Sequence, residues 1–189
     1  MPRLFSALEI PAMLRTRLSL MRGALSGARW IEPEDMHITL RFFGDIDGRT
    51  ADELAEQLGD VSATPFAVSI TGAGAFGGRD PRVLWAGVET GPDLDALYRA
   101  NERIARALGL DADARTFKPH VTLARMRGAR QSAVARFLEE FGDLRMEPFT
   151  VTRFVLLSAR PGSGGPPYGI EAEYPFAGTE LTDQTANSF

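Results

Sequence analysis

The chain contains two histidines, and each opens a tetrapeptide of the same form. His37 begins the segment HITL, and His120 begins the segment HVTL. In an extended strand successive side chains point to opposite faces. Each imidazole therefore shares a face with the threonine two residues later, Thr39 or Thr122, while the apolar residues between them face a core. Each segment offers one imidazole and one hydroxyl to the same side of a sheet.

Two imidazoles and two hydroxyls are suited to displacement at phosphorus. One imidazole can take a proton from attacking water while the other protonates the departing oxygen, because the ordinary pKa of histidine, ~6.5, is close to working pH. The threonine hydroxyls can donate hydrogen bonds to the non-bridging phosphate oxygens, where negative charge gathers in the transition state. The residues alone do not decide which histidine is the acid and which the base.

The alternative is that both tetrapeptides are ordinary strand openings, since threonine is common in strands. A single His-x-Thr segment would be weak evidence for catalysis. Here two copies occupy equivalent places in the chain and contain all of its histidines. This recurrence favours one site that uses both.

Composition restricts the classes of function. The 189 residues, 44% apolar and 24% charged, fit a soluble protein of one domain or two joined lobes. The N-terminal segment lacks the features of a signal peptide, and no apolar run approaches the ~20 residues of a membrane span. We therefore expect a cytoplasmic monomer with no membrane attachment. The net charge of −4 disfavours binding along a long nucleic acid but is compatible with a short end or a nucleotide.

No cofactor is expected. The chain has no cysteine, which excludes disulfides, thiol catalysis and cysteine metal sites. It also lacks the His-Glu-x-x-His spacing of a helical zinc site. We expect no required metal.

Hydrophobic periodicity predicts two copies of one αβ unit, at about residues 3–76 and 82–158. Each copy consists of a strand, a helix, a His-x-Thr strand, a second helix and a final strand. The predicted strands are 3–10, 36–46, 65–76, 82–89, 120–126, 148–159 and 168–178, and the predicted helices are 11–25, 49–59, 92–110 and 132–141. Such a repeat predicts two halves around one shared cleft within a single domain, 1–177. Residues 178–189 are polar and lack periodicity, so we expect a flexible tail.

The segments HITL and HVTLAR, with RLFSALEIP at the start and PRVLWAGVE between them, resemble the 2H phosphoesterase superfamily. Within it they are most similar to the RNA 2′,3′-cyclic phosphodiesterases, also called 2′-5′ RNA ligases. The resemblance covers about residues 2–176. It implies an α+β fold with two pseudo-symmetric lobes around a central cleft, each an antiparallel sheet flanked by helices.

The resemblance also implies roles and a substrate. His37 would be the general acid and His120 the general base. The enzyme would open a terminal 2′,3′-cyclic phosphate on RNA to a 2′-phosphate, with weak joining of RNA ends through a 2′-5′ bond. Arg125 matches the arginine that helps to bind phosphate in the family.

Other candidates for substrate binding come from position. Arg41 has the same strand parity as His37, whereas Arg125 reaches the face of His120 only past a bulge or a strand end. Tyr168, in a segment rich in glycine and proline, is a candidate for stacking on a base. Four further aromatic residues could also stack but are expected mostly in the core, Trp85 above all: Phe42, Phe43, Phe76 and Trp85.

Two alternatives remain open. The same chemistry could act on small cyclic nucleotides or on 2′-5′ oligonucleotides, which the net negative charge of the chain would allow. The chain could instead be a non-catalytic module that binds RNA ends or nucleotides. Two titrating imidazoles argue against the module, because binding a phosphate needs cations more than proton transfer.

Overall fold

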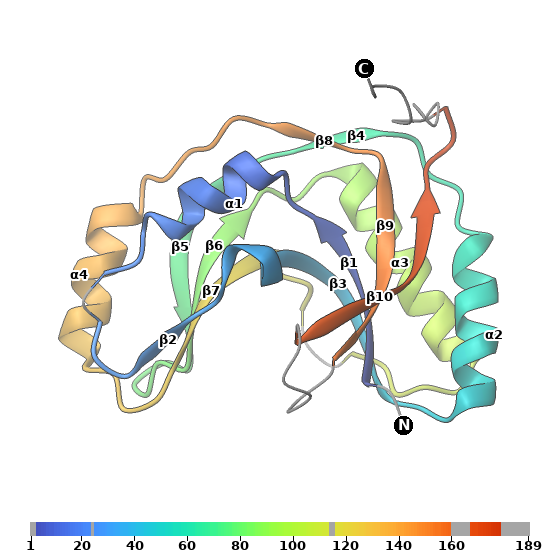
Figure 1. Cartoon of the computed structure of the whole chain (residues 1–189), viewed down its shortest axis with the longest axis horizontal. Coiled ribbons are helices and arrows are strands. Elements are labelled where there is room, and N and C mark those ends of the chain that lie inside the picture. Colours follow the sequence, from blue (N-terminus) through green and yellow to red (C-terminus); the bar gives the residue numbers. More distant parts are fainter. Residues whose placement is uncertain (1–2, 24, 114–115, 160–166, 179–189) are drawn as a thin grey trace, which may run out of the picture.

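The computed structural model describes residues 3–23, 25–113, 116–159 and 167–178 (Figure 1). The strands are β1 (Arg3–Glu9), β2 (Ala28–Trp30), β3 (His37–Asp45), β4 (Phe66–Val68), β5 (Ile70–Phe76), β6 (Val83–Val88), β7 (His120–Met126), β8 (Phe149–Val151), β9 (Arg153–Ala159) and β10 (Tyr168–Pro175). The helices are α1 (Ala12–Ser19), α2 (Gly48–Gly59), α3 (Pro92–Ala107) and α4 (Gln131–Phe141), with a short 3-10 turn, η1 (Pro33–Asp35). Residues 179–189 of the predicted tail lie outside the described residues.

The order of elements follows the predicted repeat, with three local differences. The first helix ends at Ser19 rather than continuing to residue 25, and β2 is an additional strand. The predicted strands 65–76 and 148–159 are each broken at one residue, Ser69 and Thr152. The break allows each segment to change partners: β4 and β8 pair with each other in a separate two-stranded sheet, while β5 and β9 join the main sheet.

The main sheet has eight strands in the order β10-β9-β1-β3-β7-β6-β5, with β2 paired to β7. The two repeats exchange their last strands: β9 of the second repeat pairs with β1, and β5 of the first pairs with β6. The pairings are antiparallel, so the predicted α+β class is confirmed. The two lobes are continuous through β3 and β7, between α4 at one end of the molecule and α2 at the other (Figure 1).

The two lobes meet at a single paired position. Ile38 of β3 lies opposite Val121 of β7, and it is the one register pair between these strands. Both side chains are fully buried in the main core. Each is the residue that follows a histidine of the repeated motif, so the local two-fold axis of the repeat passes between them. The sheet face opposite these side chains, which carries His37 and His120, is called the site face below.

A bulge in β3 changes which side chains reach the site face. The pairing with β1 slips by one residue after Thr39, and Leu40 has no partner. Arg41 is therefore buried on the same side as the core, and Phe42, which is exposed, shares the site face with His37.

The same bulge occurs in β7. The pairing with β6 slips after Thr122, and Leu123 has no partner. Ala124 is buried, and Arg125 is exposed on the face of His120. The prediction that Arg125 needs a bulge to reach this face is confirmed.

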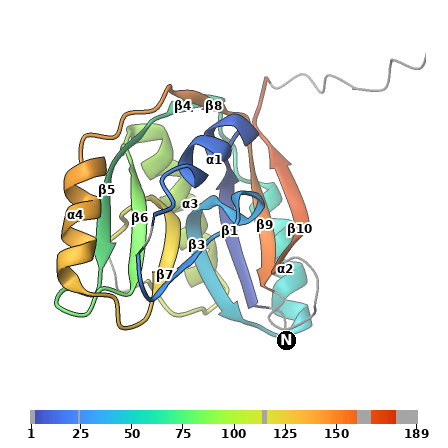
Figure 2. The same ribbon diagram turned by 60° about the vertical axis from the view of Figure 1, so that its left-hand side comes forward.

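The helices cover the face opposite the site face. Helix α3 contacts β3, α2 contacts α3 and β10, and α4 contacts β5; Figure 2 shows α4 and α2 at opposite ends of the sheet. The main core lies between this layer and the sheet. A smaller cluster of Phe5, Ala7, Val155 and Leu157 lies on the site face of one lobe. No helix in the described ranges is long and apolar enough to cross a membrane.

The bulge separates Arg41 from the histidines, so the expectation that it shares their face is wrong. Its side chain is 6% exposed, and its Nε donates to Oε2 of Glu102 on α3 at 2.5 Å. It also donates to the backbone carbonyls of Phe42 and Asp111. Burial raises the pKa of Glu102, but the hydrogen bonds and charges of Arg106 and Arg41 outweigh it, so this pKa lies below its ordinary value. Arg41 is a structural cation that joins β3 to α3.

We expect Arg41→Ala to lower the free energy of unfolding by about 3 kcal/mol, because it leaves a buried carboxylate without its buried cation. Arg106→Ala is the matched control: this arginine binds the same carboxylate but is 61% exposed, so its loss should be below about 1 kcal/mol. Urea unfolding of both variants measures the difference. Equal losses would show that the burial of the Arg41–Glu102 pair adds nothing to the free energy of unfolding.

Candidate active site

Four polar side chains gather where the lobes meet. In an antiparallel pair with Ile38 opposite Val121, His37 lies level with Thr122 and Thr39 lies level with His120. The two histidines are then diagonal neighbours across the strands, a position that separates residues by about 7–8 Å in a regular ladder. The charge of His120 acts on His37, as expected for such neighbours.

The two imidazoles are held in the same way. Nδ1 of His37 is 2.8 Å from the carbonyl oxygen of Asp35, and Nδ1 of His120 is 2.7 Å from that of Lys118. A carbonyl oxygen only accepts, so Nδ1 carries the hydrogen and donates it. In the neutral ring Nε2 then carries no hydrogen and can act as a proton acceptor. Each motif thus fixes its tautomer through the backbone two residues earlier.

The electrostatic environment links three of the predicted residues. Burial lowers the pKa of His37 to about 4; the hydrogen bond with Asp35 opposes this, and the charges of Arg125 and His120 lower the pKa further. These two charges act on His37 because they come from the same site face. His37 is therefore neutral at pH 7.

Aromatic rings enclose His37 on the site face. Its ring centroid is 5.0 Å from that of Phe5 and 5.1 Å from that of Tyr168, which meets it edge-on. Phe5 also contacts Phe42, at 5.3 Å. The structure therefore brings Tyr168 to the histidine, as the first residue of β10. Phe5 was not predicted here, although its pairing with β3 places it on this face.

His120 has its own pair of rings. Phe76 meets it edge-on at 5.0 Å, and Trp85 lies 6.1 Å away. Trp85 was expected to be packed in the core, but it lies on the site face opposite Thr122. A Cβ at Gly74 would come within 2.1 Å of its indole, so this glycine makes the space for the ring. The glycines of the TGAG segment are the signal that could have predicted it.

Among the residues that the structure describes, there is no group of three or more His, Cys, Asp or Glu side chains that could hold a metal ion. The cations near the histidines belong to the protein itself: Arg125 on β7, and Lys118, whose Nζ lies 4.6 Å from the ring centroid of Trp85. The site thus combines two imidazoles, two hydroxyls and two cations.

A family model described as the 2′-5′ RNA ligase superfamily matches residues 11–162. The chain belongs to this superfamily. The resemblance carried by the two His-x-Thr motifs is thereby confirmed, and the superfamily match includes both histidines.

Curated relatives and solved structures agree with membership of the 2′-5′ RNA ligase superfamily. An RNA 2′,3′-cyclic phosphodiesterase of Aeropyrum pernix is 35% identical over 159 residues, covering 80% of this chain and 90% of the relative. A protein of the same name from Archaeoglobus fulgidus is 30% identical over 168 residues, covering 84% and 94%. E. coli LigT complexed with 3′-AMP has a TM-score of 0.74 at 23% identity, covering 94% of this chain and 99% of that one. TT0787 of Thermus thermophilus has a TM-score of 0.75 at 23% identity, covering 94% and 100%. At this identity the solved structures bear on the fold alone.

We expect the low pKa of His37 to make stability depend on pH. The folded pKa is about 4 and the unfolded value ~6.5, so between them the unfolded chain binds more protons. The contribution of neutral His37 is fully present above pH ~6.5 and is lost as the pH falls toward 4. The difference in unfolding free energy between wild type and His37→Gln should therefore change between pH 7.5 and pH 4.5. A difference that is the same at both pH values would contradict the burial of a neutral imidazole.

Proposed function

We propose that this chain opens 2′,3′-cyclic phosphate termini of RNA to 2′-phosphomonoesters by metal-independent acid–base catalysis with two histidines. The observation that carries the proposal is the diagonal placement of His37 and His120 about the local two-fold axis, each with Nδ1 held by a backbone carbonyl. The names of the curated relatives support the substrate. Metal independence rests on the two imidazoles, which can supply both proton transfers.

In this mechanism the cyclic phosphate lies between the imidazoles. Nε2 of His120 takes a proton from water, whose oxygen attacks phosphorus. The bond from phosphorus to the 3′-oxygen breaks, and Nε2 of His37 protonates that oxygen. The product keeps its phosphate on the 2′-oxygen. The assignment of acid and base follows the family resemblance, since the two rings are held alike.

The acid role requires a proton that His37, with its low pKa, lacks at pH 7 before substrate binds. A bound phosphodiester brings a negative charge against the ring, and an opposite charge within about 4–6 Å favours the protonated form. Substrate binding thus raises the pKa of His37 and charges the acid only when its leaving group is present.

The other predicted residues receive substrate-binding roles. Thr39 and Thr122 donate hydrogen bonds to the non-bridging oxygens, and the planar fork of Arg125 binds the same group. Tyr168, beside His37, lies where the base of the terminal nucleotide can stack. If a 5′-hydroxyl replaces water, the same steps form a 2′-5′ bond, which is the weak joining activity that we include in the proposal.

Incubation with an oligonucleotide that ends in a 2′,3′-cyclic phosphate tests the proposal. In EDTA the wild type should convert it to the 2′-phosphate, identified against 2′- and 3′-phosphate standards. A 2′,3′-cyclic mononucleotide in parallel measures the preference for RNA over small nucleotides, which the net charge of −4 leaves open. Loss of activity in EDTA that one divalent metal restores would reject the metal-independent mechanism.

We expect His37→Ala and His120→Ala each to lower turnover by about 10²–10⁴-fold. The double variant should be little worse than the poorer single variant, because groups that act in one transition state are non-additive. With a p-nitrophenyl phosphodiester, whose leaving group needs no proton, only His37→Ala should recover activity. Steady-state kinetics on both substrates measures this. Recovery of His120→Ala instead would exchange the two roles, and additive losses would reject a shared site.

A further inference from the structure

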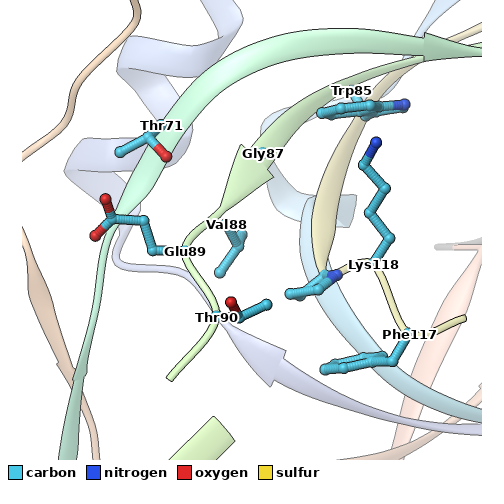
Figure 3. Close-up of a pocket in the computed structure, with 9 residues that line it drawn as sticks. Thr71, Trp85, Gly87, Val88, Glu89, Thr90, Phe117 and Lys118 are labelled. Carbon is cyan, nitrogen blue, oxygen red and sulfur yellow. The ribbon is translucent and has the colours of Figure 1, made fainter. Parts of the chain in front are cut away.

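A pocket lies next to His120, on the side away from His37. Its volume is about 450 Å³, and it is formed by β5, β6 and the segment that leads into β7 (Figure 3). The strand order β3-β7-β6-β5 places His37 first, His120 next and this pocket beyond them. The aromatic rings around His37 lie on the opposite side of the two histidines from this pocket.

The geometry of the proposed reaction determines which reacting oxygen lies nearest to the pocket. In an in-line displacement the attacking and departing oxygens are on opposite sides of phosphorus. With His37 at the departing 3′-oxygen, the terminal ribose lies in the lobe of Phe5 and Tyr168. The attacking oxygen is then on the side of His120, and the pocket begins where that oxygen enters.

Strand β6 has no side chain at the position opposite His120. Gly87 lies opposite His120 and lines the pocket, and it has no side chain to stand between them. A Cβ there would come within 2.5 Å of the carbonyl oxygen of Thr71. The close approach of β5 to β6 thus requires glycine at the entrance.

The pocket has an apolar wall, one cation and one carboxylate, Glu89, which lies beside Thr71 and away from the cation (Figure 3). Phe117 and Pro119 provide apolar surface, and Lys118 is the one lysine of the chain. Figure 3 shows its ammonium pointing at the indole of Trp85, 4.6 Å from the ring centroid. In the described part of the chain no carboxylate pairs with this ammonium. The cation–π contact holds it in place but leaves its hydrogen-bonding capacity unused.

We propose that this pocket binds a nucleoside whose 5′-hydroxyl faces His120 and whose 3′-phosphate binds Lys118, so that it serves as an acceptor site for RNA joining. The Lys118 ammonium lies over Trp85 and Phe76, and these two rings also flank His120, so the cation and the imidazole border the same space. The site deepens the proposed function and rests on the roles given there to the two histidines.

The joining step balances without a further reactant. His120 takes the proton of the 5′-hydroxyl, and its oxygen forms a bond to phosphorus. The bond between phosphorus and the 3′-oxygen breaks, and His37 gives its proton to that oxygen. The product is a 2′-5′ phosphodiester with a free 3′-hydroxyl.

Two acceptors, offered to the wild type and to three variants, test the site. The acceptors are a nucleoside with a free 5′-hydroxyl and the same nucleoside with a 3′-phosphate, each offered with a 2′,3′-cyclic donor. In the wild type the 3′-phosphate should lower the half-saturating acceptor concentration about tenfold, as expected for a charge-assisted hydrogen bond. Lys118→Gln should abolish this preference, and Lys118→Arg should keep it. Arg49→Gln, on the exposed face of α2, is the matched loss of charge and should also keep it.

Two results would overturn the acceptor site. One is a preference for the 3′-phosphate that survives in Lys118→Gln. The other is a wild type that hydrolyses the donor but transfers it to neither acceptor. A wild type that does not hydrolyse the donor at all would instead reject the proposed function.

Discussion

The pairing of Ile38 with Val121 is the constraint on which the rest of the site depends. Because side chains alternate along a strand, burying these two residues turns their neighbours on both strands to the opposite face. A slip of one residue would bury the imidazoles and expose the two aliphatic side chains, at a cost in both burial of polar groups and loss of core. The stability of the core therefore holds the register that places His37 and His120 on the site face.

The matched bulges give β3 and β7 the same backbone path but different side chains on the site face. In both strands the fifth residue after histidine returns to the site face, but it is Phe42 in one and Arg125 in the other. The residue before it turns inward, as Arg41 in one and Ala124 in the other. The backbone obeys the two-fold relation while the side chains give one lobe an aromatic surface and the other a cation. A substrate with a base at one end and an anionic phosphate at the other needs this difference.

Much of this could be predicted from local patterns. Period-two alternation identified the shared face of each histidine and threonine, and the repeat of the motif predicted the shared site. Alternation failed for Arg41, because the bulge in β3 adds one unpaired residue and so reverses the faces of the residues that follow. The sequence does not show where such an extra residue lies. The expectation that Trp85 packs in the core failed for another reason: an apolar strand has the same composition whether its ring faces the core or the site. The exchange of β5 and β9 between lobes depends on pairing between distant segments, which local periodicity does not encode.

The low pKa of His37 follows from the same architecture that positions it. The ring is enclosed by Phe5 and Tyr168 and faces the charge of Arg125, and both burial and this charge disfavour a proton on His37. In the proposed mechanism a bound phosphate anion offsets that balance, because it is attracted by the guanidinium that repels the proton. Arg125 would then act in opposite senses before and after substrate binding: it keeps His37 neutral before the anion binds, and it helps to bind the anion that favours the protonated ring. The proposal therefore links proton uptake and substrate binding through one cation, placed on the site face by a single unpaired residue, Leu123.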